Sequence, residues 1–91
     1  MKFPLRFDAT TSRADFVRLL PRATRTENIV ATVDGYAGPG WRLKLAAITP
    51  LEIGSVRLER HRIEIDFDGL SAIEQDEFMR CFTHHYQRGG G

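Results

Sequence analysis

Apolar and polar side chains alternate along three separate stretches of the chain, residues 3–7, 29–33 and 41–45, and this pattern restricts the possible folds more than any other. Successive side chains of a strand point to opposite faces, so the alternation is typical of strands with one face buried and one in water. Pro4 has no N–H to donate, so the first strand belongs at an edge or has a solvent-facing side at that residue. The pattern therefore predicts a half-buried antiparallel sheet.

A short helix is expected between the first two strands. The hydroxyls of residues 10–12 can cap its first turn, and Asp15 suits the positive end of the helix dipole. The apolar residues Phe16, Leu19 and Leu20 fall on one side. Pro21 predicts the end of this helix, because the residue before a proline is pushed away from helical angles.

The glycine-rich segment 34–40 predicts a loop between two strands. If Val33 faces Trp41, the pairs Ala31–Leu43 and Ile29–Leu45 follow, and all six apolar side chains share one face, as a hairpin requires.

The next apolar residues change parity partway along the chain. Val56 and Leu58 occupy even positions, whereas Ile63, Ile65 and Phe67 occupy odd ones. A straight strand would send the two sets to opposite faces. A turn at Arg60-His61 avoids this by creating the pairs Glu59–Arg62, Leu58–Ile63, Arg57–Glu64 and Val56–Ile65. The alternative is one long strand bent by a bulge near residues 59–62; we favour the hairpin.

Thr49-Pro50 predicts a break before the Val56 strand. Pairing across this break places Trp41 near Leu58, Leu43 near Val56, and Gly54 opposite Leu45. This register leaves a surplus apolar set off the inward face: Val30, Ile48, Leu51 and Ile53. An exposed apolar set of this kind usually marks a surface for a protein partner or for self-association.

A second helix is predicted near the end of the chain. Ser71 and Glu74 have the spacing of a capping box, and an apolar stripe follows at helical spacing: Phe78, Cys81, Phe82 and His85. Gly89 is a natural C-cap.

These elements predict an α+β fold of order β-α-β-β-β-β-α, with a small antiparallel sheet of four to five strands and two helices on one face. Residues 1–88 are expected to form a single domain and residues 89–91 a flexible glycine tail. The expected core consists of Phe3, Leu5, Phe7, Phe16, Leu19, Leu20, Trp41, Leu43, Val56, Leu58, Ile63, Ile65, Phe67, Phe78 and Phe82.

Composition favours a cytoplasmic protein. Hydrophobic residues make up 42% and charged residues 27% of the 91 residues, the ordinary globular mixture. No apolar run approaches the roughly 20 residues that cross a bilayer, and residues 1–6 lack the apolar stretch of a secretory signal. The only cysteine, Cys81, cannot form an internal disulfide, which favours a reducing compartment.

The sequence offers weak candidates for a metal site. Cys81 and His85 are one helical turn apart, and His61 is a conceivable third ligand. The spacing matches no recognised motif, and the apolar stripe favours packing roles for Cys81 and His85. The glycine segment 34–40 precedes a strand, whereas a phosphate cradle needs a helix N-terminus behind it. We therefore predict no metal, no cofactor, no catalytic residue and no enzymatic activity.

The positive charge is concentrated in the first two thirds of the chain. Residues 1–62 carry eleven Lys/Arg and six Asp/Glu, a net +5, whereas residues 63–91 carry two and six, a net −4. Arg57, Arg60 and Arg62 could track a phosphate backbone from a protruding hairpin. Nucleic-acid binding is therefore an alternative function, although a solvated charged face is the simpler interpretation.

The last two residues, Gly90-Gly91, resemble the tail of ubiquitin-like sulfur carriers. In that family the terminal glycine is adenylated and then loaded with sulfur, which would assign that role to Gly91. Those proteins have a β-grasp fold whose tail follows a final strand, whereas Gly89 here follows a predicted helix. Three glycines are equally consistent with a helix stop.

The leading functional hypothesis is a non-enzymatic accessory domain that binds a protein partner or a second copy of itself. It depends on the surplus apolar residues and on the lack of any convergent polar cluster in the sequence.

Overall fold

The computed structural model describes residues 4–87 of the chain. The elements are β1 (Arg6–Ala9), α1 (Arg13–Thr24), β2 (Val30–Ala31), β3 (Gly35–Gly38), β4 (Trp41–Ile53), β5 (Val56–Phe67) and α2 (Ala72–Gln87). The predictions for Phe3, for the Gly89 cap and for the 89–91 tail concern residues outside the described range.

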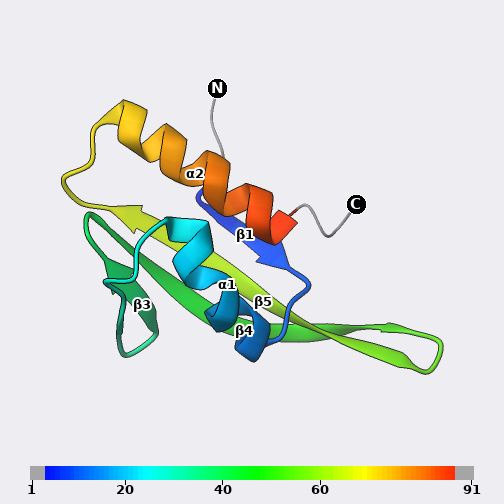
Figure 1. The fold of residues 1–91 in the computed structure, drawn as a ribbon. Helices are drawn as coiled ribbons and strands as arrows, with labels where there is room; N and C mark the ends of the chain where they lie inside the picture. Colours follow the sequence, from blue (N-terminus) through cyan, green and yellow to red (C-terminus); the bar gives the residue numbers. More distant parts are fainter. Residues whose placement is uncertain (1–3, 88–91) are drawn as a thin grey trace.

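The five strands form one antiparallel sheet in the order β1-β5-β4-β3-β2, and both helices cover the same face (Figure 1). The predicted α+β class and the predicted order of elements are thereby confirmed. The first strand lies at an edge, one of the two placements expected from Pro4. The molecule is elongated, with extents of 45 × 30 × 18 Å, because β4 and β5 continue well beyond the helices.

Helix α1 begins where the sequence predicts but ends later. Ser12 is its N-cap and accepts a hydrogen bond from the Asp15 N–H. The prediction that Pro21 ends the helix is wrong, because the helix continues to Thr24 and Arg25 closes it in the left-handed conformation. Ala23 and Thr24 are buried, so packing against the core favours the last turn despite the proline.

Helix α2 confirms the capping box. The Glu74 carboxylate accepts from the Ser71 N–H at 2.8 Å, and the Ser71 hydroxyl accepts from the Glu74 N–H at 3.2 Å. Two otherwise unpaired donors of the first turn are satisfied in this way.

The hairpin between β3 and β4 is tighter than the sequence predicts. Tyr36 pairs with Leu43 and Gly38 with Trp41, so most of the glycine segment is strand and not loop. The predicted pairing of Val33 with Trp41 is wrong, as are the two pairs that followed from it, and Val33 is fully exposed. Gly35 is required where it lies, since a Cβ there would stand 2.0 Å from the Leu43 carbonyl oxygen.

The strand β5 runs without interruption from Val56 to Phe67, so the predicted turn at Arg60-His61 is wrong. The chain turns instead at Gly54, which has a φ of 60°. The alternative of one long strand is the correct one, but the bulge lies in β4, between Ile48 and Leu51, and not in β5. Thr49-Pro50 is therefore a bulge within β4, and the break predicted there does not occur.

This topology replaces the predicted β4–β5 register. The predicted partners of Trp41, Leu43 and Leu45 were Leu58, Val56 and Gly54. Their observed partners are Phe67, Ile65 and Ile63. None of the four pairs predicted around Arg60-His61 exists, because both members of each lie on the same strand.

The core lies between the helices and the covered part of the sheet. Phe82 of α2 is its centre and contacts the rings of Phe7, Phe16, Phe78 and Tyr86. Most of the predicted core residues are buried or packed against this cluster. Leu5, Val56 and Leu58 are corrections, because all three are exposed.

Candidate functional site

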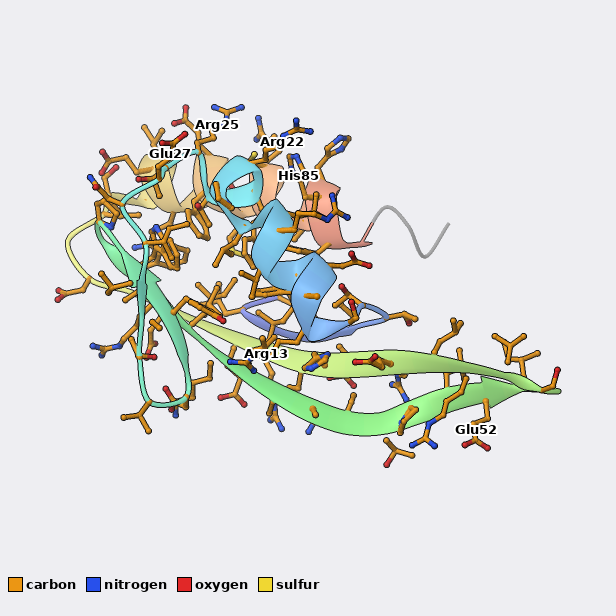
Figure 2. All side chains as sticks on the ribbon, turned by 60° about the horizontal axis from the view of Figure 1, so that its bottom comes forward. Arg13, Arg22, Arg25, Glu27, Glu52 and His85 are labelled. Atoms are coloured by element: carbon orange, nitrogen blue, oxygen red, sulfur yellow. The ribbon has the colours of Figure 1, made fainter. Side chains whose placement is uncertain are left out.

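The hairpin of β4 and β5 extends past its neighbours as a two-stranded arm, here defined as residues Ile48–Arg60. Strand β1 ends opposite His61 of β5, and β3 pairs with β4 only as far as Lys44. Figure 1 shows the arm as the twisted ribbon that leaves the helix-covered part of the molecule, and Figure 2 shows Glu52 near its tip, far from the helices.

One face of the arm is apolar. Leu51 pairs with Leu58 and Ile53 with Val56, so the four side chains lie together as an apolar strip. Their exposed fractions are 40%, 38%, 61% and 52%, respectively. Ile63 and Ile65, at odd positions of β5, are buried under the helices. Val56 and Leu58 occupy even positions of the same strand, so their side chains point the other way. The apolar strip therefore lies on the face of the sheet that the helices do not cover.

The bulge in β4 brings the apolar side chains of β4 to the same face of the arm as those of β5. Leu43 and Leu45 point toward the helices, and plain alternation would put Leu51 and Ile53 on that same face. One extra residue between Ile48 and Leu51 reverses the parity of β4 beyond it. The two apolar residues of β4 therefore join the two of β5.

The opposite face of the arm is charged. Glu52 pairs with Arg57 across the two strands, and Glu59 is two residues further along β5. All three residues are exposed. The arm thus has two distinct faces, one apolar and one with charges of both signs.

The base of the arm is fixed to the edge strand by ion pairs. The Asp8 carboxylate accepts from Arg62 at 2.8 Å and lies 3.6 Å from the Arg60 guanidinium. The hydrogen bond from Arg62 holds the pKa of Asp8 below its ordinary value of 3.8, and the charge of Arg60 adds to the effect. Arg60 also donates to the Thr49 carbonyl in the bulge at 3.3 Å.

These contacts change the interpretation of the three arginines. Arg60 and Arg62 share the Asp8 carboxylate, and Arg57 is the cross-strand partner of Glu52. The arrangement resembles a bracing network more than a basic track for phosphates.

The candidate metal ligands lie on different elements. On α2, the His85 ring donates from Nδ1 to the Cys81 carbonyl at 2.9 Å, and the Cys81 thiol donates to the Arg22 carbonyl at 3.5 Å. His61, on β5, is buried and donates from Nδ1 to the Thr11 carbonyl at 2.8 Å. Within residues 4–87, no three His, Cys, Asp or Glu side chains are grouped closely enough to hold a metal ion.

A cleft of about 380 Å³ lies between the end of α1 and the first half of α2. Its walls include Trp41, Phe78 and Cys81, with Glu74 and Glu77 at the rim. Figure 2 shows Arg22, Arg25 and His85 on this helical side of the molecule. Cys81 is half-buried, and neither the expected core set nor the buried core cluster includes it. Among the described residues, every fully buried side-chain N or O atom has a hydrogen-bond partner, so no buried polar side chain is left unpaired beside the cleft.

The surplus apolar residues are only partly brought together. Leu51 and Ile53 belong to the apolar strip, and Ile48 is half-buried beside its partner Arg60. Val30 is also exposed, but it lies on the edge strand β2, which β3 separates from the two strands of the arm. Val56 and Leu58, both predicted in the core, are instead surface residues, and their change of parity relative to Ile63 is the signal for this in the sequence.

Comparison of this chain with protein-family models, with curated proteins and with solved structures gives no match. Neither helix in the described part of the chain is long and apolar enough to cross a membrane. The function is therefore argued from the arm and its surroundings.

Proposed function

We propose that this chain is a non-enzymatic protein-binding domain and that the arm is its contact surface. The observation that carries the proposal is the apolar strip, four large side chains between 38% and 61% exposed on one face of a projecting hairpin. Burying apolar surface against a partner is favourable by about 25 cal/mol per Å², so such a strip favours association.

The position of the strip supports a role outside the fold. All five buried core residues of β4 and β5 lie before Ile48 or after Arg60, and every residue from Leu51 to Glu59 is exposed. An isolated two-stranded hairpin is only marginally stable in water. The contacts of Arg60 with Asp8 and with the Thr49 carbonyl brace the arm at its base, which favours a projecting surface of defined shape.

The chemistry of the arm indicates a protein partner. Its apolar face suits an apolar surface of another chain, and its charged face, with Glu52, Arg57 and Glu59, suits side chains of both signs. The lone Cys81 is consistent with a reducing compartment, and we propose that the binding occurs in the cytoplasm.

Site-specific photo-crosslinking in the source cells tests this function. A benzophenone amino acid is placed at Val56 or Leu58, and at Ile73 of α2 as the matched control, since Ile73 is 72% exposed but far from the arm. We expect one discrete protein adduct, identified by mass spectrometry, from both arm positions and none from Ile73. Adducts that are absent at the arm, or equal at all three positions, would contradict the proposal.

A further inference from the structure

The edge of β5 along the arm has backbone groups that point outward. The Ile65 N–H donates to the Leu5 carbonyl at 2.8 Å, so odd-numbered residues of β5 direct their backbone groups toward β1. Beyond the end of β1, the same alternation directs the N–H and C=O of Arg57 and Glu59 to the open edge. The open edge comprises five residues, Val56–Arg60.

The other edge of the arm is closed to strand pairing. It belongs to β4, where Pro50 has no N–H and the bulge interrupts the regular ladder. The β5 edge contains neither a proline nor a bulge. Of the two edges, only that of β5 can accept a further strand along its whole length.

We propose that the arm pairs with the arm of a second copy, β5 against β5, antiparallel about a two-fold axis at Leu58. This inference deepens the proposed function by naming the partner. Arg57 then lies opposite the partner's Glu59, and Glu59 opposite the partner's Arg57. Each of these two pairs exchanges two backbone hydrogen bonds, because both members direct their N–H and C=O to the open edge.

The charges select this register over its neighbours. An axis at Arg57 would oppose two arginines, and an axis at Glu59 would oppose two glutamates, and like charges directly opposite are destabilising. An axis between two residues would place a residue whose N–H and C=O point to the open edge opposite one whose N–H and C=O point to β4, so the two could not exchange hydrogen bonds. Leu58 is also the midpoint of Val56–Arg60, so the partner's five residues fit between the end of β1 and the turn at Gly54.

The apolar faces join in this arrangement. Leu51 and Leu58 of one copy continue into Leu58 and Leu51 of the partner subunit, giving a row of four leucines across four strands. On the charged face, Glu52, Arg57 and the partner's Glu59 alternate in sign across three strands. Both faces are therefore self-complementary, as an isologous two-fold interface requires.

Two charge-reversing variants test the register. Arg57→Glu alone and Glu59→Arg alone each turn two attractive pairs into two repulsive pairs, so we expect each to weaken dimerisation about tenfold or more. Mixed together, the two variants are complementary at both pairs. We expect the mixture to form a heterodimer with affinity within about threefold of the wild type.

Sedimentation equilibrium of the single proteins and of the mixture, over a wide range of concentration, gives the dissociation constants. Glu27→Arg is the matched control, because it makes the same charge change at an exposed residue outside the arm (Figure 2). It should leave the wild-type constant unchanged. Circular dichroism on each variant checks that these exposed substitutions leave the fold intact.

The outcomes separate this inference from the proposed function. A wild-type chain that stays monomeric at every concentration, or a mixture no better than its components, would overturn the self-pairing. In that case, arm-specific crosslinks to a different protein would still support the protein-binding function. A chain that neither associates with itself nor gives arm-specific crosslinks would refute the self-pairing and the protein-binding function together.

Discussion

The same two strands, β4 and β5, behave differently in the body of the molecule and in the arm. In the body their inward side chains, such as Trp41 and Ile63, are buried under the helices. In the arm the apolar residues Leu58 and Ile53 lie on the other face and are exposed. An alternating pattern therefore shows which side chains share a face of the sheet, but not whether another element covers that face.

A single extra residue separates the two regions. The bulge between Ile48 and Leu51 changes the parity of β4 just beyond the end of β1, which stops pairing opposite His61, whereas β3 stops pairing with β4 earlier, at Lys44. The chain thus keeps its apolar residues together on both sides of the boundary, although they change face.

Truncation of an apolar side chain should be far more costly in the body than in the arm. Phe82→Ala removes a ring that is 0% exposed and contacts four other rings, so we expect a loss of about 3–5 kcal/mol in the free energy of unfolding. Leu58→Ala in the arm should cost less than about 1 kcal/mol. Urea denaturation measures both, and equal losses would show that the arm is part of the core.

Substitution of a glycine should likewise cost more stability in the body than in the arm. Gly35→Ala in β3 forces a Cβ into the backbone of Leu43, so we expect a loss of about 2 kcal/mol or more. Gly54→Ala at the arm tip meets no atom within 4 Å, and its cost of about 1 kcal/mol arises only from the φ of 60°. Thermal unfolding of both variants measures this, and a greater loss for Gly54→Ala would contradict the structure.

Alkaline pH should destabilise the body through Tyr86. Its hydroxyl donates to the Phe16 carbonyl at 2.8 Å, and burial raises the pKa of the phenol above its ordinary value of 10.0. The folded chain favours the neutral phenol, so this contribution is complete below about pH 10 and falls as the pH rises further.

Tyr86→Phe should therefore cost about 1 kcal/mol at neutral pH, the worth of the hydrogen bond. The difference between the two proteins should shrink above pH 10, as followed by urea denaturation at several pH values. A constant difference would show that the pKa of Tyr86 is the same in the folded and unfolded chains, so that burial does not hold the phenol neutral.

Removal of the arm should have the smallest effect on stability. Replacing residues 49–59 by Asn-Gly leaves Ile48 and Arg60 as the pair that closes a two-residue turn. We expect the free energy of unfolding to change by less than about 1 kcal/mol, and the arm-dependent association to disappear. Nuclear magnetic resonance spectra that lose the dispersed signals of the body would show that the fold depends on the arm.

Much of the fold could be predicted because its signals are local. The capping box of Ser71 and Glu74 and the cap at Ser12 depend on residues three positions apart, and both were found. The arm could not be predicted in the same way. Arg60-His61 and Thr49-Pro50 both had the sequence features of an interruption, yet the structure continues through both.

The class of fold, the order of its elements and the starts of its helices could be predicted from the residues alone. The strand register, the turn at Gly54 and the continuation of α1 past Pro21 became known only from the folded chain. Caps and alternation depend on neighbours in the chain. Register and burial depend instead on partners far away in the sequence, whose packing energy exceeds the local preferences of a proline or a turn.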